Sequence, residues 1–237
     1  MLRLLDLQYK YKGEPRPALD GFTAELSEGM VTALLGPNGA GKSTALGIAA
    51  GWRKPGSGRL ERDGAAAFLP QMERLAFAFS CLEYVSFGRA PHLPYLGVPG
   101  GEDREIAADA LRKVGMIEKR DKPITALSGG ELQLVRLARA LAQEAAWTVL
   151  DEPSDMLDPG HVAQVSAVLR GIAESGDGVV LSTHDLGFAL AVADRAVLVK
   201  DGRALAAGPC AELITPEAMG ELYGQRFGWA RLPWPTH

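Results

Sequence analysis

The sequence predicts an α/β fold with a parallel sheet, a β-rich N-terminal part and a mostly helical insertion. Short continuous apolar runs, such as residues 30–35 and 148–150, are typical of strands buried on both faces. Near the C-terminus such runs alternate with helical patterns, which indicates βαβ units. Residues 72–126 instead carry apolar side chains mainly at helical spacing. We therefore expect a sheet-centred core interrupted by a helical segment.

The individual elements follow this division in order. The N-terminal part is expected to hold a helix over 43–50 and strands over 2–11, 21–26, 30–35 and 66–69. In the middle, the Pro- and Gly-rich residues 88–101 predict a loop, and residues 102–114 predict an amphipathic helix. The C-terminal part is expected to hold helices over 130–144, 162–174 and 186–193 and strands over 148–150, 178–182 and 196–200.

The composition is that of an ordinary globular chain. It has 237 residues, of which 47% are hydrophobic and 23% charged, and a formal net charge of −4. This mildly acidic balance does not favour a nucleic-acid partner held by phosphate contacts. Apolar runs fall short of the roughly 18 residues that cross a bilayer, and Arg3 interrupts the one at the N-terminus. We expect a cytoplasmic protein in which Cys81 and Cys210 are reduced thiols rather than a disulfide.

A glycine-rich loop between an expected strand and an expected helix predicts a nucleoside triphosphate site. Residues 36–44, GPNGAGKST, satisfy the pattern G-x-x-x-x-G-K-[ST]. Glycines let backbone N–H groups turn toward phosphate oxygens, and the helix adds its positive dipole end. Lys42 is expected to pair with the β- and γ-phosphates, and Ser43 to bind Mg²⁺. The predicted nucleotide-binding residues of this loop are Gly36, Pro37, Asn38, Gly39, Ala40, Gly41, Lys42, Ser43 and Thr44.

Two carboxylates end the apolar run 148–150. In an open α/β sheet the carboxyl ends of the strands face the ligand crevice, so Asp151 and Glu152 are expected to lie there. Asp151 is expected to hold Mg²⁺, directly or through water, and Glu152 to polarise the attacking water as general base. Alone, this pattern is more typical of a strand that enters a solvated loop. The phosphate loop makes the catalytic interpretation the better one.

A third motif precedes a long amphipathic helical pattern. Residues 127–131 read LSGGE, in which Ser128 is a typical helix N-cap. Gly129 and Gly130 leave the N–H groups of the helix start open to an anion. By itself this is an ordinary capped helix. Because it lies 24 residues before Asp151 and accompanies the phosphate loop, the sequence resembles the ATP-binding cassette (ABC) ATPases over nearly its whole length.

This resemblance implies a fold and a division of the chain. The implied fold is a P-loop NTPase (RecA-like) core with a β-rich N-terminal subdomain and a helical subdomain insertion. The whole chain would be one ABC ATPase domain. Residues 1–71 and 129–237 would form the nucleotide-binding core, and residues 72–128 the helical subdomain.

The resemblance also implies roles for residues outside the first three motifs. Gln71 is similar to the glutamine that senses the metal and the attacking water, and His184 to the histidine that contacts the γ-phosphate. Tyr11 resembles the aromatic residue that stacks on adenine, with Tyr9 as its rival. Residues 154–158 resemble the D-loop that bridges two subunits, although Asp155 departs from the small or neutral polar residue usual there.

In this family two cassettes pair head to tail around two ATP molecules, with Mg²⁺ as cofactor. The resemblance therefore implies that each site combines residues of two copies. One chain would supply the catalytic residues Lys42, Gln71, Glu152 and His184, together with the magnesium ligands Ser43, Gln71 and Asp151. The other would supply the ATP contacts Ser128, Gly129, Gly130 and Glu131. ATP binding would close the dimer and hydrolysis would open it.

The usual partner of a lone cassette is a dimer of membrane permease subunits, so the resemblance places the chain peripherally at the cytoplasmic face of the cell (inner) membrane. Residues 77–84 either receive a permease helix or pack the helical insertion's own core. Residues 85–92, VSFGRAPH, resemble a stretch of the importers for iron–siderophore complexes, haem and vitamin B12, as do residues 213–217 and 222–224. In these importers the permease and a substrate-binding protein read the cargo, so a substrate-binding protein is an indirect partner.

Three other functions compete with metal-chelate import. A soluble ABC ATPase, such as a factor of iron–sulfur cluster assembly, is disfavoured by the importer-like residues 88–92. An exporter subunit would carry the same motifs and stays open. Cassettes that act on nucleic acid or ribosomes carry two cassettes or large insertions, and 237 residues with one phosphate loop disfavour both.

Overall fold

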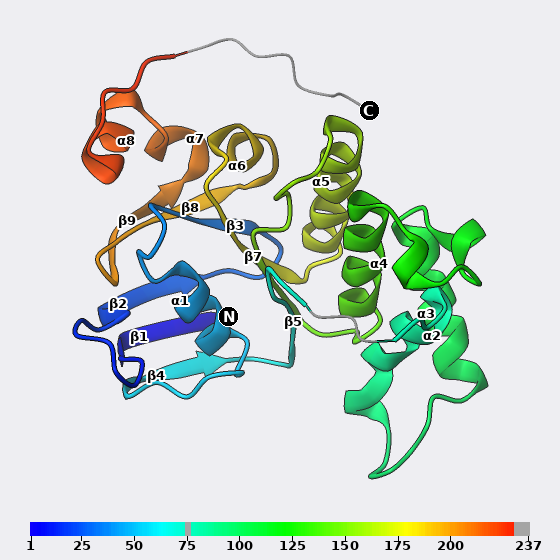
Figure 1. The fold of residues 1–237 in the computed structure, drawn as a ribbon. Coiled ribbons are helices and arrows are strands. Elements are labelled where there is room, and N and C mark those ends of the chain that lie inside the picture. The colour runs from blue at the N-terminus through cyan, green and yellow to red at the C-terminus, as the bar shows by residue number, and fades with distance from the viewer. Residues whose placement is uncertain (74–76, 230–237) are drawn as a thin grey trace.

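Two sheets form the centre of the computed structural model, which describes residues 1–73 and 77–229 (Figure 1). The smaller sheet is antiparallel, with strand order β2-β1-β4, where β1 is Leu2–Tyr9, β2 is Leu19–Leu26 and β4 is Ser57–Arg62. The larger sheet has the order β5-β6-β7-β3-β8-β9. Its strands are β3 (Val31–Leu35), β5 (Ala66–Leu69), β6 (Trp147–Asp151), β7 (Gly178–Thr183), β8 (Arg195–Lys200) and β9 (Arg203–Pro209).

The larger sheet is the predicted parallel sheet, with one antiparallel edge. β5, β6, β7, β3 and β8 run parallel, and only β9 pairs antiparallel. Every residue of β3, β6 and β7 is buried, as their unbroken apolar sequences predicted. The predicted α/β fold class is confirmed.

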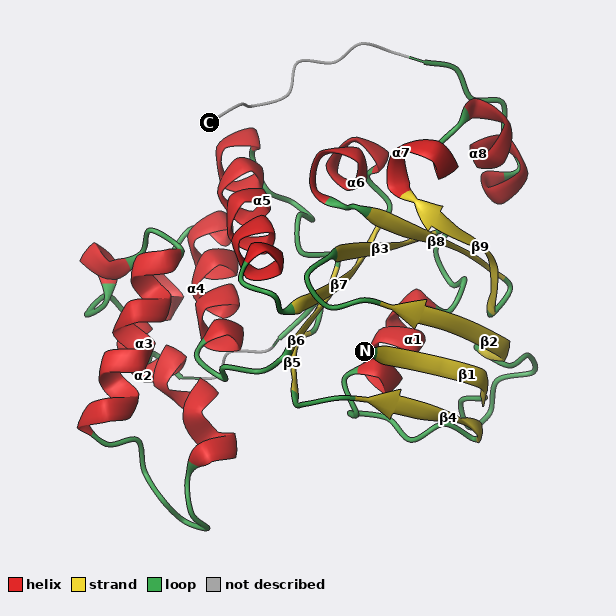
Figure 2. Ribbon diagram, turned by 180° about the vertical axis from the view of Figure 1, so that it is seen from behind, coloured by secondary structure: helices red, strands yellow, loops and turns green. Residues whose placement is uncertain are grey.

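Helices cover both faces of this sheet. On one face, α1 (Lys42–Ala49) lies between the two sheets and shares a core with β1 and β2 (Figure 2). On the other face pack α5 (Pro159–Glu174) and α6 (Leu186–Val192). The short helices α7 (Cys210–Leu213) and α8 (Pro216–Tyr223) close the β8–β9 edge. The carboxyl ends of β3, β6 and β7 therefore meet in the middle of the molecule.

The helical part stands to one side of the sheets (Figures 1 and 2). It contains α2 (Cys81–Ser86), the 3-10 helix η1 (Phe87–His92), α3 (Gly101–Lys113) and the short turns η2 (Ile117–Lys119) and η3 (Ile124–Ala126). The following helix, α4 (Gly129–Leu141), packs on α2 and α3 and also on β5 and α5. Because α4 belongs to both parts by contact, the division at residues 72 and 128 remains a prediction.

The structure differs from the predicted elements at residues 87–92 and contains elements that were not predicted, among them β4, β9, α7 and α8. Residues 87–92 form η1 rather than the start of a loop, because Gly88 and Arg89 are buried against α4. The edge strand β4 was not predicted because it carries few apolar residues, and its side chains are exposed or half-buried. The edge strand β9 was not predicted either, although residues 204–207 are apolar, and most of its side chains are exposed or half-buried.

Both cysteines are buried free thiols, as predicted. Burial raises the pKa of the Cys210 thiol to about 11. Across residues 1–73 and 77–229, the helices are too short or too polar to span a bilayer.

Candidate active site

The phosphate loop connects β3 to α1, and its backbone requires glycine at two points. Gly36 follows β3 at a φ of 159°, and a Cβ there would lie 2.0 Å from the carbonyl oxygen of Val199. Gly41 is the N-cap of α1 at a φ of 105°, where a Cβ would lie 2.4 Å from the carbonyl oxygen of Ala18. The loop can therefore pass close to both neighbouring segments only because these residues have no side chain.

Lys42 folds back over the loop that precedes it. Its side-chain nitrogen donates to the carbonyl oxygens of Gly36, at 2.7 Å, and Pro37, at 3.1 Å. Burial lowers the pKa of Lys42, and the nearby carboxylates of Glu152 and Asp151 oppose that shift. An anion entering the loop can therefore recruit a preplaced ammonium group that donates to two carbonyl oxygens.

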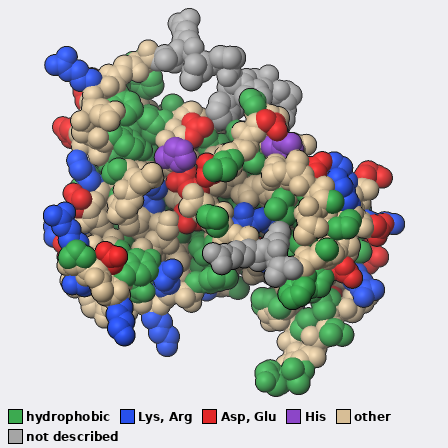
Figure 3. Space-filling view, in the orientation of Figure 1, with side chains coloured by type: hydrophobic (Ala, Val, Ile, Leu, Met, Phe, Trp, Pro, Cys, Tyr) green, Lys and Arg blue, Asp and Glu red, His purple; other side chains and the backbone are tan. Residues whose placement is uncertain are grey.

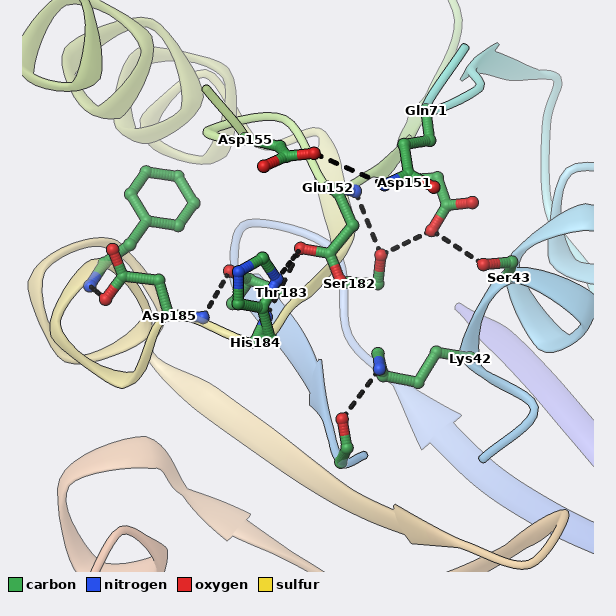
Figure 4. A network of polar contacts seen from close by, with 12 residues as sticks. Lys42, Ser43, Gln71, Asp151, Glu152, Asp155, Ser182, Thr183, His184 and Asp185 are labelled. Atoms are coloured by element: carbon green, nitrogen blue, oxygen red, sulfur yellow. Dashed lines mark hydrogen bonds and ion pairs between the residues drawn. The ribbon is translucent and has the colours of Figure 1, made fainter. Parts of the chain in front are cut away.

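The two acidic residues lie at the end of β6, beside the end of β7 (Figure 4). Asp151 accepts hydrogen bonds from the hydroxyls of Ser43, at 3.1 Å, and Ser182, at 2.5 Å. Glu152 is 8% exposed and has a φ of 50°. One of its carboxylate oxygens lies 3.0 Å from Nδ1 of His184. The strand order thus brings together the phosphate loop, the acidic pair and the histidine that the sequence places far apart.

The chemistry of these donors fits magnesium. The hydroxyl of Ser43 and the carboxylate of Asp151 are adjacent oxygen donors at the entrance of the phosphate loop. Mg²⁺ in phosphate sites takes one or two protein oxygens and completes its shell with phosphate and water. Ser182 and the backbone hold Asp151 and Glu152 in place, since the amide of Glu152 donates to the Ser182 hydroxyl at 3.0 Å.

A cavity of about 810 Å³ opens over this arrangement. Acidic side chains and a histidine gather there, in the middle of the face that Figure 3 shows. The predicted site residues among its lining are Tyr11, Asn38, Gly39, Ala40, Gly41, Lys42, Ser43, Thr44, Gln71, Glu152 and His184. Glu14, Arg16, Pro17, Ala18 and Asp155 complete the lining and were not predicted as ligands.

Tyr11 and Gln71 lie at the wall of this cavity. Tyr11 lines the cavity and Tyr9 does not, and the Tyr11 hydroxyl lies 3.1 Å from that of Thr44. The guanidinium of Arg53 lies 5.2 Å from the centre of the Tyr11 ring. Gln71 has an exposed side chain whose amide donates to Asp155 at 3.4 Å. The unusual D-loop aspartate thus touches the glutamine of the site.

The LSGGE motif lies apart from this cavity. Ser128 caps α4, its hydroxyl accepts from the amide of Glu131, and the Glu131 carboxylate accepts from the amide of Ser128. Hydrogen bonds from Lys119 and from the Ser128 amide hold the pKa of Glu131 at about 2. Residues 128–131 are absent from the cavity's lining as described for residues 1–73 and 77–229. One copy of the chain therefore does not bring this motif to its own phosphate loop.

Sequence reasoning missed a positioning network on α4. Arg136 is 7% exposed and donates to the backbone oxygens of Pro70 and Gln71 and to the side chain of Gln133. Gln133 in turn donates to the carbonyl oxygen of Pro153 at 3.0 Å. The helix that begins at Ser128 therefore holds both the segment of Gln71 and the segment after Glu152. A charged residue on the apolar side of an amphipathic pattern was the available signal.

The core role predicted for residues 77–84 is confirmed for Tyr84 and Phe79, and the permease-docking role stays a prediction. Tyr84 is 3% exposed and packs in the core of the helical part. Phe79 packs against that core and meets the ring of Phe87 edge-on at 4.9 Å. Phe77 is 68% exposed. The segment is thus mostly core, and the exposed ring of Phe77 lies beside that of Phe79.

The fold and this arrangement define a P-loop nucleoside triphosphatase, because a glycine-rich strand-to-helix loop faces a carboxylate pair at the end of a neighbouring parallel strand. Residues 19–155 match the family model described as ABC transporter. The chain belongs to the ABC transporter family, and it is an ATPase of that family. The family that the sequence resembles is therefore confirmed.

Named relatives and solved structures agree with this assignment. The chain is 38% identical to the hemin import ATP-binding protein HmuV of Rhodococcus jostii, over 88% of this chain and 75% of the relative. It is 40% identical to the protein of the same name from Streptomyces coelicolor, over 89% and 79%. A metal-chelate type ABC transporter in an inward-facing conformation superposes with a TM-score of 0.85, at 31% identity, over 93% of this chain and 88% of that one. A dimeric ATP-binding cassette in a post-hydrolysis state, bound to ADP and phosphate, gives a TM-score of 0.79 at 27% identity, over 89% and 99%.

Proposed function

We propose that the chain is the ATP-hydrolysing subunit of an importer that takes up haem or a related metal chelate through a partner permease. The names of the relatives support uptake and point to hemin among the chelates. The transporter that superposes on the chain is of the metal-chelate type, which supports the same class of cargo. The chain would bind the permease peripherally from the cytoplasmic side.

Nucleotide binding in this proposal uses one chain's cavity. The adenine stacks on Tyr11, which lies at the cavity wall next to Thr44. The phosphates enter the loop 36–44, where Lys42 exchanges its carbonyl partners for β- and γ-phosphate oxygens. The proposed magnesium ligands are Ser43, Asp151 and Gln71. When bound there, Mg²⁺ neutralises charge on the β- and γ-phosphates.

Hydrolysis in this proposal is general-base catalysis by Glu152. Its carboxylate accepts a proton as the water oxygen bonds to the γ-phosphorus and the bond to the β–γ bridging oxygen breaks. His184 lies 3.0 Å from the same carboxylate, so its ring can orient the base and reach the γ-phosphate. Burial of Glu152 keeps competing water away from the carboxylate.

A second copy completes each site. The residues 128–131 lie outside the cavity of their own chain, and their position at the N-terminus of α4 suits an anion such as the γ-phosphate of a partner's ATP. The dimeric cassette that superposes on this chain supports pairing of two copies. Head-to-tail pairing would give two equivalent sites, and ATP would link their closure to the permease.

The observation that carries the proposal is the placement of Lys42, Ser43, Glu152 and His184 around one cavity, with Asp151 hydrogen-bonded to Ser43 beside it. It is tested by isolating the tagged Glu152→Gln chain from native membranes in mild detergent with ATP. A stoichiometric polytopic partner is expected.

ATP hydrolysis by the reconstituted wild-type complex should then rise with hemin and its binding protein more than with ferric siderophore or cobalamin. Copurification of soluble partners alone would instead support the assembly-factor alternative, and stimulation only by a substrate added on the cytoplasmic side would support export.

A further inference from the structure

A buried arginine joins the helical part to the end of α4. Arg89, in η1, is 6% exposed. Its Nη1 donates to the carbonyl oxygen of Ala142 at 2.9 Å and to the carboxylate of Glu144 at 2.6 Å. Its Nε donates to Asp103 at 3.1 Å, and Asp103 also accepts from the amide of Gly100 at the start of α3. One guanidinium thus ties the start of α3 to the C-terminal end of α4.

The residues on either side of Arg89 contact the same helix end. A Cβ on Gly88 would lie 2.3 Å from the carbonyl oxygen of Arg139, so only glycine lets η1 approach α4 this closely. The Nε2 of His92 lies 2.8 Å from the carbonyl oxygen of Gln143. The last carbonyl groups of a helix have no partner within it. We call Gly88, Arg89 and His92 the clamp, because together they pack on the last turn of α4 and occupy the carbonyl groups that follow it.

The clamp contacts the C-terminal end of α4, which lies between the LSGGE motif and the acidic pair in the sequence. From this end, the 13 residues of α4 extend about 20 Å back to the N-cap, Ser128. In the other direction, five residues connect α4 to β6 and the acidic pair. In this turn Glu144 adopts a φ of 48°, a left-handed conformation that is strained for a residue with a side chain. Its ion pair with Arg89 holds that turn in place.

We propose that Arg89 is a positioning residue for ATP-driven closure, acting through α4 on Ser128, Gly129 and Gly130. This inference rests on the proposed head-to-tail dimer. A rod of about 20 Å that rotates by about 10° at one end moves its other end by about 3.5 Å, which is enough to lose contact with a phosphate. The clamp prevents such a rotation of α4 by holding its C-terminal end, which lies far from the partner's nucleotide. Arg89 lies outside the lining of its own chain's cavity, so we infer that its main effect is on the contribution that α4 makes to the partner's site.

If Arg89 positions α4, its loss has a different effect than if Arg89 only stabilises the helical part. Nucleotide affinity of the separate chain depends on Tyr11 and the phosphate loop, which the clamp does not touch. Closure of the dimer depends on where α4 presents its N-terminus. A positioning role therefore weakens dimerisation and leaves nucleotide binding intact.

The experiment compares Arg89→Lys with Arg112→Lys in the Glu152→Gln background. Lysine keeps the charge at position 89 but offers a single ammonium in place of the guanidinium fork, which reaches three acceptors. Arg112 is the matched control, since it lies on α3, is half exposed and pairs with Asp109 on the same helix. Sedimentation with ATP gives the dimer dissociation constant, and a fluorescent ATP analogue gives nucleotide affinity. Arg89→Lys should weaken the dimer about tenfold or more and change nucleotide affinity less than about twofold, while Arg112→Lys should change neither.

Two further variants separate the possible failures. Gly129→Asp has open space for its side chain but sets a negative charge where the partner's phosphate should lie, so it must also weaken the dimer. If Gly129→Asp weakens the dimer and Arg89→Lys does not, the role of Arg89 is overturned and the pairing stands. If the parent chain stays monomeric with ATP, the pairing fails and the role of Arg89 fails with it.

If Arg89→Lys does not fold, His92→Ala is the alternative variant, since it removes a single contact of the same clamp. It must weaken the dimer by a smaller factor, and an unchanged dimer would refute the role of the clamp.

Discussion

At the scale of single residues, the ammonium of Lys42 is held by the backbone until an anion replaces it. Because its present partners are two carbonyl oxygens, phosphate oxygens offer it a stronger, charge-assisted interaction. Lys42→Ala should therefore reduce ATP hydrolysis about a hundredfold or more, as measured by phosphate release. Lys54→Ala, at an exposed position, is the control and should keep full turnover. Unchanged turnover in Lys42→Ala would refute the assignment of the phosphate loop.

The carboxyl of Glu131 makes the stability of α4 depend on pH. Its pKa falls from 4.5 to about 2, first because Lys119 donates to it and then because the Ser128 amide does. The folded chain thus favours the ionised form of Glu131 more than the unfolded chain does. The stabilisation is therefore present above about pH 4.5 and is lost between about pH 4.5 and 2. The wild-type chain should have a higher melting temperature than Glu131→Gln at about pH 6, and the difference should shrink by about pH 3.

Thermal unfolding followed by circular dichroism at several pH values measures this difference. Glu118→Gln is a suitable control, since Glu118 is exposed in the neighbouring turn η2 and makes no side-chain hydrogen bond among residues 1–73 and 77–229. A gap between wild type and Glu131→Gln that stays constant with pH would show that the ion pair with Lys119 does not contribute.

Residue roles that depend on local spacing were predictable, and those that depend on tertiary contact were not. The sequence of residues 36–44 is enough to predict the phosphate loop, since the backbone requires glycine at positions 36 and 41. Ser182 gave no such signal, because its importance comes from pairing of β6 with β7, which sets its hydroxyl 2.5 Å from Asp151. Arg136 likewise acquires its role only when residues 70 and 71 fold against α4.

At the scale of elements, the contact between α4 and α5 depends on the absence of one side chain. A Cβ on Gly130 would lie 2.6 Å from the ring of His161, near the start of α5. Gly130→Ala should therefore destabilise the chain by about 1–3 kcal/mol through overpacking. In a His161→Ala background the clash is gone, and the same substitution should become neutral or stabilising by up to about 1 kcal/mol, because alanine favours the helix.

Chemical denaturation of the four chains, wild type, both single variants and the double variant, measures this change of sign. Gly171→Ala is the control, since Gly171 lies inside α5 with open space around it and should gain stability in both backgrounds. An equal loss from Gly130→Ala with and without His161 would mean that the glycine is required by the backbone of α4 rather than by α5.

Elements with a strong local pattern were predicted within a few residues, and those formed by pairing were not. The helix predicted over 130–144 is Gly129–Leu141, and the strand predicted over 30–35 is Val31–Leu35. The edge strand Ser57–Arg62 carries alternating charges and becomes a strand only by pairing with β1. The 3-10 helix Phe87–His92 exists where a Pro- and Gly-rich sequence predicted a loop, since its glycine and arginine lie against α4.

At the scale of the whole molecule, one chain places its phosphate loop, Glu152 and His184 at one cavity and its LSGGE motif elsewhere. The two groups of residues can act on one nucleotide only if a second copy approaches with its α4 N-terminus toward the cavity. ATP would then lie between the copies, so its γ-phosphate would be part of the interface. Cleavage of that phosphate removes the link, which is how hydrolysis could reopen the dimer.

The substitution Glu152→Gln tests this link directly. Glutamine has nearly the shape of glutamate but cannot take the proton from water, so ATP should bind and persist. With ATP and Mg²⁺ the variant should migrate as a dimer on gel filtration and retain ATP for at least about a hundredfold longer than the wild-type chain. Glu212→Gln, at an exposed position in α7, should behave as wild type. If Glu152→Gln stays monomeric while it binds ATP, the γ-phosphate does not join two copies, and residues 128–131 must have a different role.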